Sequence, residues 1–232
     1  MLKRQYRLGR LAPSAPGNTA LSKSRREYNT IMNLIEYFYP QNTGAISTSN
    51  FSATFGERCI LDIGCGDEYL RHGFEENSWK YHGIDFDTCD VERDLLPYED
   101  KSFDIVSSLA VIEHLHDPSV FISEAKRVCK AEGIVILSTP NWQYCTHDFY
   151  DDPTHIRPYT PIGLKSMLQL AGFKDIRIVP NLRCKHKRSY TGRLAFLMAA
   201  LLPFRSDCRY GDAIPEIIKG KARGIFAICL NN

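Results

Sequence analysis

A strand that runs directly into a glycine-containing turn constrains the fold of this chain more than any other feature. Residues 60–69 read ILDIGCGDEY, where apolar residues lead into Asp62 and glycines follow at positions 64 and 66. Glycine adopts backbone conformations that other residues avoid, so the chain can turn tightly there and approach a bound ligand closely. A turn of this kind between a strand and a helix indicates a site for a nucleotide-like ligand.

The residues around the turn exclude two common nucleotide sites. A dinucleotide fingerprint needs a third glycine at position 69, which is Tyr69, and the Gly-Lys-Ser/Thr element of a P-loop is missing from the turn. Asp62 lies at the end of the strand, where a carboxylate would repel a pyrophosphate but would suit a ligand that carries an ammonium group. The turn therefore predicts a cofactor with a cationic amino-acid part.

Strand and helix signals alternate along the rest of the chain. The predicted strands are apolar or β-branched, and the predicted helices carry apolar side chains at helical spacing. We expect strands over 59–63, 81–85, 103–109, 133–139, 174–179 and 224–230, and helices over 67–78, after Asp117-Pro118, and from Pro161 to Gly172. This alternation predicts an α/β fold, with a mostly parallel sheet and helices on both faces.

The length of 232 residues suits one large domain. Residues 1–24 contain no Asp or Glu, and we expect a basic flexible leader there, with an organellar targeting segment as the alternative. Residues 25–232 are expected to form a single domain that opens with a helix over 25–40. Residues 181–223 are interpreted as a lid-like insertion.

Composition restricts the partners and the compartment. The net charge is only +2 and no basic stripe with interleaved aromatic residues is evident, so no nucleic-acid partner is expected. The eight cysteines form no CxxC pair, which indicates a reducing, cytoplasmic environment without a disulfide framework. Residues 183–204 combine basic residues with an apolar stretch too short to span a bilayer, so peripheral contact with a membrane is the alternative to a lid.

Five segments in order carry a resemblance to a known family. They are ILDIGCG, YHGID, RDLLPYEDKSFDIV, AVIEHLHDP, and STPN with the later DPTHIRPYTPIGLKSMLQLAGF. Over about residues 58–180 the chain resembles the class I S-adenosylmethionine-dependent methyltransferases. The resemblance implies a Rossmann-like, doubly wound, mostly parallel seven-stranded sheet with an antiparallel last strand, and S-adenosyl-L-methionine as the cofactor. The last segment is similar to a subset that modifies small molecules, sugars, and quinone-like or lipid-linked acceptors.

The resemblance also implies which residues line the cofactor site. These are Asp62, Gly64, Cys65, Gly66, Asp85, Asp94, Leu95, Val111 and His114. Asp85, at the end of the second strand, would accept hydrogen bonds from the ribose hydroxyls. Asp94 and the backbone of Leu95 would lie at the adenine edge. Val111 and His114, together with Glu113, would lie beside the cofactor in the loop after the next strand.

Two departures from the family pattern bear on this site. The first motif of the family often has a third glycine where this chain has Glu68, whose side chain either points to solvent or narrows the methionine pocket. Asp85 and Asp94 lie only nine positions apart, which leaves no room for the usual helix and third strand. We therefore expect a shortened connection at this αB/β3 edge, where Asp87 and Asp90 compete with the favoured Asp85 for the ribose.

Methyl transfer from a sulfonium is an in-line displacement, and a hydroxyl acceptor must also lose its proton, which a positioned base assists. His155 and Asp152, in the polar segment after the fifth family strand, are the predicted catalytic residues. The alternative is that they only order the loop before the next helix. No metal site is expected, because no further ligand is spaced to join Glu113, His114 and His116.

The leading hypothesis is an enzyme that methylates an oxygen of a small-molecule, saccharide or lipid-linked acceptor. Methylation of nitrogen or carbon is one alternative, and a non-catalytic protein that binds S-adenosylmethionine is another, since fold does not determine function. An amino-type DNA methyltransferase is disfavoured, because AVIEH stands where that class carries Asn/Asp-Pro-Pro-Tyr/Phe. Neither the acceptor nor the oligomeric state follows from the sequence.

Overall fold

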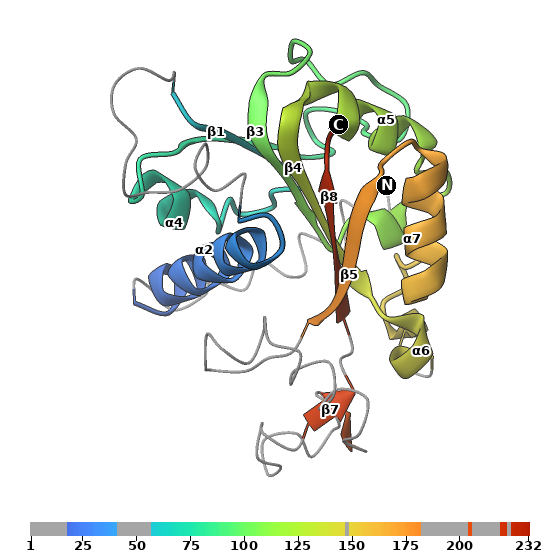
Figure 1. The fold of residues 1–232 in the computed structure, drawn as a ribbon. Coiled ribbons are helices and arrows are strands. Elements are labelled where there is room, and N and C mark those ends of the chain that lie inside the picture. Colours follow the sequence, from blue (N-terminus) through green and yellow to red (C-terminus); the bar gives the residue numbers. More distant parts are fainter. Residues whose placement is uncertain (1–17, 41–56, 147–148, 182–203, 206–218, 222–223) are drawn as a thin grey trace.

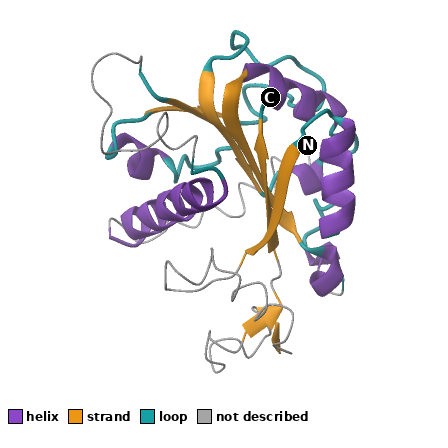
Figure 2. Ribbon diagram, in the orientation of Figure 1, coloured by secondary structure: helices purple, strands orange, loops and turns teal. Residues whose placement is uncertain are grey.

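The computed structural model describes residues 18–40, 57–146, 149–181, 204–205, 219–221 and 224–232. Within these residues a central sheet lies between two layers of helices (Figures 1 and 2). Residues 1–17 of the expected leader lie outside the described residues, as do residues 183–203 and most of the expected lid. The predictions of targeting, lid and membrane contact for these segments therefore stay predictions.

The central sheet has six strands in the order β2-β1-β3-β4-β8-β5. Their bounds are β1 (Cys59–Ile63), β2 (Lys80–Ile84), β3 (Phe103–Leu109), β4 (Cys129–Pro140), β5 (Asp175–Asn181) and β8 (Gly224–Leu230). Strands β1 to β4 pair in parallel, whereas β8 pairs antiparallel with both β4 and β5. The expected Rossmann-like sheet with an antiparallel last strand is confirmed. Two short strands, β6 (Phe204–Arg205) and β7 (Lys219–Lys221), pair with each other separately.

The expected number of seven strands is wrong, because the central sheet as described has six. The strand that is missing relative to the family pattern would follow β2, so β2 forms an edge of the sheet. Residues 85–95 turn instead, with Cys89 N donating to Asp85 O at 3.0 Å and Asp94 N to Asp90 O at 2.7 Å. These local bonds use backbone groups that a strand would offer to its neighbour. The shortened connection is thus confirmed at the edge where the spacing of Asp85 and Asp94 predicts it.

Helices cover both faces of the sheet (Figures 1 and 2). The helices α2 (Asn18–Phe38) and α4 (Arg71–Glu75) lie on one face, and α5 (Ser119–Val128) and α7 (Pro161–Leu170) lie on the other. Successive strand side chains point to opposite faces, so Ile60, Ile105 and Ile136 belong to one apolar cluster and Leu61, Val106 and Leu137 to the other. Short helices follow β3 and β4, namely η1 (Ile112–His114), α6 (Trp142–Cys145) and η2 (Phe149–Asp151).

The N-terminal helix starts earlier than the sequence indicates. Helix α2 begins at Asn18 rather than residue 25, so residues 18–24 are helical and do not belong to a flexible leader. Ser24 is buried, and its Oγ accepts a hydrogen bond of 2.8 Å from Gly73 N in α4. Arg25 Nη2 pairs with Glu76 Oε1 at 2.6 Å. Contacts with α4 thus stabilise the first turns of α2, whose polar sequence does not by itself predict a helix.

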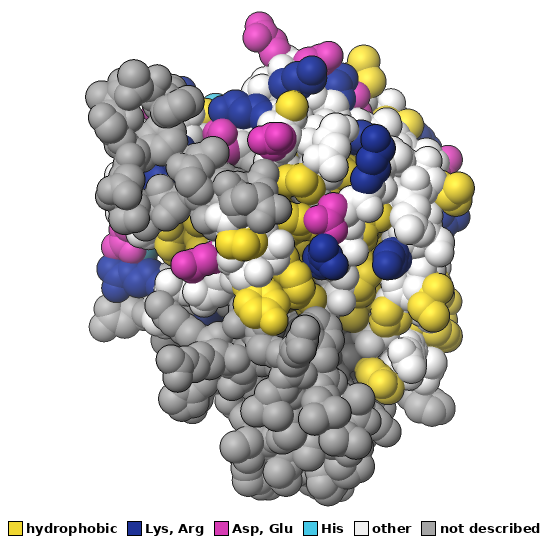
Figure 3. All heavy atoms as spheres, viewed as in Figure 1, with side chains coloured by type: hydrophobic (Ala, Val, Ile, Leu, Met, Phe, Trp, Pro, Cys, Tyr) yellow, Lys and Arg dark blue, Asp and Glu magenta, His cyan; other side chains and the backbone are white. Residues whose placement is uncertain are grey.

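The surface carries charges of both signs. On the face shown in Figure 3, Lys and Arg side chains are interspersed with Asp and Glu over the described residues. This mixture agrees with the small net charge of +2. None of the helices that the structure describes is long and apolar enough to cross a membrane.

Candidate active site

Four parallel strands end at the same edge of the sheet, and the chain changes direction between two of them. From β1 the chain proceeds to β2 on one side, and then to β3 on the other side of β1. In open α/β sheets, ligands bind in the crevice outside the carboxyl ends of the strands at such a switch point. The segments that follow β1, β2, β3 and β4 carry the predicted site residues.

The turn after β1 can be built only with glycine at its first bend. Gly64 and Gly66 have φ of +78° and +55°, which is the left-handed region. A Cβ at Gly64 would overlap the Cγ2 methyl group of Val111, whereas a Cβ at Gly66 would meet nothing within 4 Å. The backbone at Gly66 therefore borders open space, and this cradle fits a cofactor that approaches the main chain closely.

Glu68 takes the position of the family's third glycine, and its φ of +52° lies in the left-handed region. Its two carboxylate oxygens accept hydrogen bonds of 2.9 Å from Arg71 Nε and 2.7 Å from Arg71 Nη2. The side chain is thus held by Arg71 on the following helix. Cys65 is buried, and a Cβ at Gly83 would lie 2.9 Å from its Sγ, so Cys65 packs against β2.

Asp62 lies beneath the turn with its side chain 2% exposed. Tyr81 Oη donates to Asp62 Oδ2 at 2.7 Å, and Ser107 Oγ donates to Oδ1 at 2.9 Å. Burial raises the pKa of Asp62 to about 6, although both hydroxyls favour its charged form. The carboxylate therefore joins β1 to β2 and β3, and it places a negative charge beneath the glycine turn at neutral pH.

Asp85 connects the end of β2 to the glycine turn. Its Oδ2 accepts a hydrogen bond of 2.9 Å from Gly66 N, and its Oδ1 accepts one of 2.7 Å from Phe86 N. Asp85 is partly buried, whereas Asp87 and Asp90 lie exposed on the turns that follow. Of the three competing acids, Asp85 is therefore the one that the fold brings against the predicted cofactor cradle.

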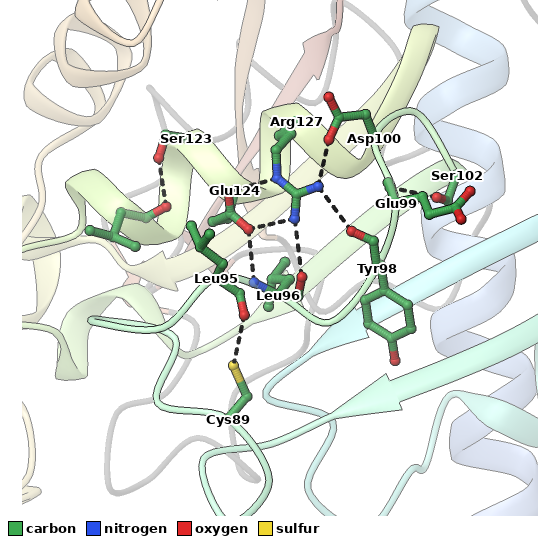
Figure 4. Close-up of polar contacts among 11 residues, drawn as sticks. Cys89, Leu95, Leu96, Tyr98, Glu99, Asp100, Ser102, Ser123, Glu124 and Arg127 are labelled. Carbon is green, nitrogen blue, oxygen red and sulfur yellow. Dashed lines mark hydrogen bonds and ion pairs between the residues drawn. The ribbon is translucent and has the colours of Figure 1, made fainter.

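Helix α5 fixes the segment expected at the adenine edge (Figure 4). Leu96 N donates to Glu124 Oε2 at 2.8 Å, and Arg127 Nη2 donates to Leu96 O at 3.1 Å. Arg127 also pairs with Glu124 at 2.7 Å, so the two side chains form one anchor. The neighbouring Leu95 side chain is 73% exposed, and Asp94 Oδ2 accepts from Asp90 N at 3.1 Å. The anchor thus holds the backbone of this segment while the Leu95 side chain stays exposed.

The loop after β3 contains an unusually buried acid. Glu113 is 0% exposed, and neither of its carboxylate oxygens has a hydrogen-bond partner among the residues that the structure describes. Burial raises the pKa of Glu113 to about 7. Val111 contacts the glycine turn, and His114 Nδ1 lies 2.9 Å from Thr154 O in the loop that follows β4.

The segment after β4 supports both interpretations of the predicted catalytic pair. Asp152 Oδ1 accepts hydrogen bonds from Thr154 N at 3.0 Å and Thr154 Oγ1 at 2.6 Å, which orders the loop. The other oxygen, Oδ2, lies 3.9 Å from His155 Nε2. His155 Nδ1 lies 2.6 Å from Phe149 O. Asp152 therefore orders the loop and also lies close to the ring nitrogen of His155.

The fold brings residues together that lie far apart in the sequence. The rings of His114 and His155 are 4.8 Å apart between centroids. One possible ligand atom from each of Glu113, His114 and His155 lies within 4.8 Å of the others. The expectation of no metal site considered only residues 113–116, and nothing in local spacing could have added His155. Sequence reasoning does not single out Tyr81 and Ser107, because their strands contain other polar residues such as His82 and Ser108.

The part of the chain that carries these residues is similar to known proteins. A family model described as a methyltransferase domain matches residues 25–178. The chain is 31% identical over 134 residues to a probable S-adenosylmethionine-dependent methyltransferase of Mycolicibacterium smegmatis, covering 50% of this chain and 52% of that protein. It is 27% identical over 104 residues to a ubiquinone biosynthesis O-methyltransferase of Neisseria meningitidis, covering 35% and 44% respectively. The chain spans about half the length of its mycobacterial curated relatives.

Solved structures share the fold at low identity. A SAM-dependent methyltransferase from Archaeoglobus fulgidus has a TM-score of 0.51 at 22% identity, covering 86% of this chain and 99% of that chain. A methyltransferase solved in a complex with the Trm112 activator of Haloferax volcanii has a TM-score of 0.52 at 12% identity, covering 90% and 94%. At these identities the likeness concerns the fold alone.

The doubly wound sheet and the glycine cradle at its switch point define a Rossmann-like cofactor-binding domain. The chain belongs to the family of class I S-adenosylmethionine-dependent methyltransferases, and its cofactor is S-adenosyl-L-methionine. The individual contacts of Asp62, Asp85, Asp94 and the other predicted residues with that cofactor stay predictions.

Proposed function

We propose that this protein methylates an oxygen atom of a small-molecule, saccharide or lipid-linked acceptor. S-adenosylmethionine, when bound, supplies an electrophilic methyl group on its sulfonium. The observation that carries the proposal is the position of His155, which lies next to both Asp152 and His114. His114 belongs to the loop after β3, and Val111 of the same loop contacts the glycine turn. The name of the Neisseria relative, an O-methyltransferase, supports an oxygen acceptor as well.

The hydrogen bond to Phe149 determines which nitrogen of His155 can act as a base. A carbonyl oxygen only accepts hydrogen bonds, so Nδ1, which lies 2.6 Å from Phe149 O, carries the proton. In the neutral ring Nε2 then keeps its lone pair and can take the proton of an acceptor hydroxyl. The Asp152 carboxylate, 3.9 Å from Nε2, would stabilise the imidazolium that results. Such assistance contributes roughly 100- to 10,000-fold to a rate.

The test compares His155→Gln with His116→Gln. His116 is exposed and does not belong to the group formed by Glu113, His114 and His155. Formation of S-adenosylhomocysteine would be assayed with phenols, catechols, free saccharides, isoprenoid-linked phenols and amines. We expect product from an oxygen acceptor, with kcat reduced roughly 100- to 10,000-fold in His155→Gln and little changed in His116→Gln. Calorimetry should show the same S-adenosylmethionine affinity in both variants.

Three outcomes would contradict the proposal. A methylated amine as the main product would favour the nitrogen alternative. Tight cofactor binding without turnover of any acceptor would favour a non-catalytic protein. Full activity in His155→Gln would limit that residue to ordering the loop.

A further inference from the structure

Glu113 is a buried acid for which no ion pair is found among the described residues. It is 0% exposed, and its two carboxylate oxygens lack hydrogen-bond partners among the described residues. Buried carboxylates are normally hydrogen-bonded, paired with a cation, or bound to a metal ion. The methyl-transfer chemistry assigned to His155 does not use this side chain. A further group that interacts with Glu113 would account for its position.

Two histidines face the same point as this acid. Ligand atoms of Glu113, His114 and His155 all lie within 4.8 Å of one another. Two atoms bound to one ion lie at most about 4.4 Å apart, since metal–nitrogen and metal–oxygen bonds are about 2.0–2.2 Å long. A small shift of the side chains would therefore let one ion contact all three. Both histidines are partly exposed, so the cluster is reachable from solvent while its carboxylate is shielded.

Hydrogen bonds hold both histidines in the form that binds metals. Thr154 Oγ1 donates to Asp152 at 2.6 Å, so toward His114 Nδ1, 3.0 Å away, it acts as an acceptor. His114 Nδ1 therefore carries a proton, as His155 Nδ1 does beside Phe149 O. The lone pair of each neutral ring is then on Nε2. Histidine ligands typically donate their other N–H to a carbonyl or carboxylate in this way.

The backbone also holds the two loops together at this point. Glu113 O accepts hydrogen bonds from Ile156 N at 2.8 Å and from Arg157 N at 3.0 Å. The loop after β3 is thus attached to the residues that directly follow His155. The three side chains are therefore positioned by the fold before any ligand is bound, which is what a metal site requires.

We propose that Glu113, His114 and His155 bind one divalent transition-metal ion next to the acceptor. Two imidazoles and one carboxylate suit Mn²⁺, Fe²⁺, Co²⁺ or Zn²⁺, and three protein ligands leave further coordination positions open. Binding of the ion does not depend on the proposed function. Its role does, because an ion bound at Nε2 of His155 would assist the loss of the acceptor proton in place of that nitrogen. An acceptor hydroxyl that approaches the ion would lose its proton to water more readily. Its oxygen then forms the bond to the methyl group as the bond from methyl to sulfur breaks.

Mn²⁺ is the probe of choice, because the cysteines of the chain prefer softer ions such as Zn²⁺. The full chain, treated with a chelator and dialysed, would be titrated with Mn²⁺ in a calorimeter. We expect one ion per chain, and affinity at least about 100-fold lower in His155→Gln and in Glu113→Gln. His116→Gln is the matched control and should bind as the parent chain does. Circular dichroism checks the fold of each variant, and the partly exposed His155 provides the test if Glu113→Gln does not fold.

Absence of saturable Mn²⁺ binding, or equal affinity in His155→Gln and the parent chain, would overturn the proposal. The methyl-transfer assay then separates the site from its role. Activity that is lost with chelator and restored by Mn²⁺ supports a role in catalysis, and activity unchanged by chelator overturns that role and leaves His155 as the base. A chain that binds Mn²⁺ through these residues but methylates no oxygen acceptor supports the metal site and contradicts the proposed function.

Discussion

The two halves of the site are built in different ways. The cofactor half, defined as residues 62–66 with Asp85, depends on backbone conformation and on bonds between strand ends. The acceptor half, defined as residues 113–114 with Asp152 and His155, is a cluster of side chains from two loops. Substitutions in the cofactor half should therefore change binding and stability together. Substitutions in the acceptor half should change chemistry more than binding.

Gly64→Ala should have the largest effect on the cofactor half. The new Cβ would overlap Val111, and a φ of +78° adds strain for any residue with a side chain. We expect a loss of about 4 kcal/mol in the free energy of unfolding, from overpacking and backbone strain together. Displacement of the turn should also weaken S-adenosylmethionine binding by roughly 100-fold. Urea unfolding and calorimetric titration measure the two effects.

Gly66→Ala is the matched control, because Gly66 shares the left-handed conformation but borders open space. It should lose only about 1–2 kcal/mol, the cost of the conformation itself. Adding Val111→Ala to Gly64→Ala should recover part of the lost stability. Equal destabilisation by the two glycine substitutions would show that contact with Val111 does not restrict the turn.

Asp62→Asn tests whether the buried acid of the cofactor half titrates as its environment indicates. The pKa of a free aspartate is about 3.9, and burial raises that of Asp62 to about 6. The unfolded chain releases its proton first, so the stability contributed by Asp62 falls as pH rises from about 4 to about 6 and then stays constant. We expect Asp62→Asn to remove about 2–3 kcal/mol of this dependence, measured by urea unfolding between pH 4 and 8.

Asp87→Asn, at an exposed position, is the control for this experiment. It should retain the parent slope between pH 4 and pH 6. Asp62→Asn also removes a constant contribution to stability at every pH, because one hydroxyl that donates to the carboxylate loses its acceptor. The test therefore depends on how the free energy of unfolding changes between pH 4 and pH 6, and not on its absolute value. The same change in Asp62→Asn as in the parent chain would contradict the titration of Asp62.

The same contrast explains what could be predicted from the sequence. The strands Phe103–Leu109 and Gly224–Leu230 have the expected bounds, because continuous β-branched and apolar runs mark buried strands locally. The sequence also predicts the positions of the glycine turn and of Asp85, since each directly follows a strand, while their contacts with the cofactor stay predictions. Local pattern thus contains most of the cofactor half.

The acceptor half could be predicted only in part. His155 was selected from its segment, but its proximity to Glu113 and His114 depends on how the loops after β3 and β4 meet. Hydrophobic periodicity reports local structure only, so it cannot predict a contact between residues about 40 positions apart. The start of helix α2 at Asn18 was missed for the same reason, because packing against α4 stabilises its polar first turns.

Asp85→Ala should have a moderate effect confined to binding. The substitution removes the acceptor of the Gly66 N–H, which costs about 1 kcal/mol of stability. If Asp85 also binds the ribose, S-adenosylmethionine affinity should fall about tenfold or more. Asp87→Ala, on the exposed turn, should leave both quantities unchanged. A larger loss of affinity in Asp87→Ala than in Asp85→Ala would show that Asp87 rather than Asp85 binds the ribose.

Glu68→Gly should have the smallest effect, and it tests whether the departure from the family motif matters. Glycine would relieve a φ of +52°, a gain of about 1 kcal/mol. It would also remove the partly exposed ion pair with Arg71, a loss of at most about 1 kcal/mol. The two changes nearly cancel in stability. Because Arg71 holds the carboxylate, S-adenosylmethionine affinity should also stay within about threefold of the parent value. A tenfold gain in affinity would instead mean that Glu68 narrows the pocket, and that a side chain as well as the backbone shapes the cofactor half.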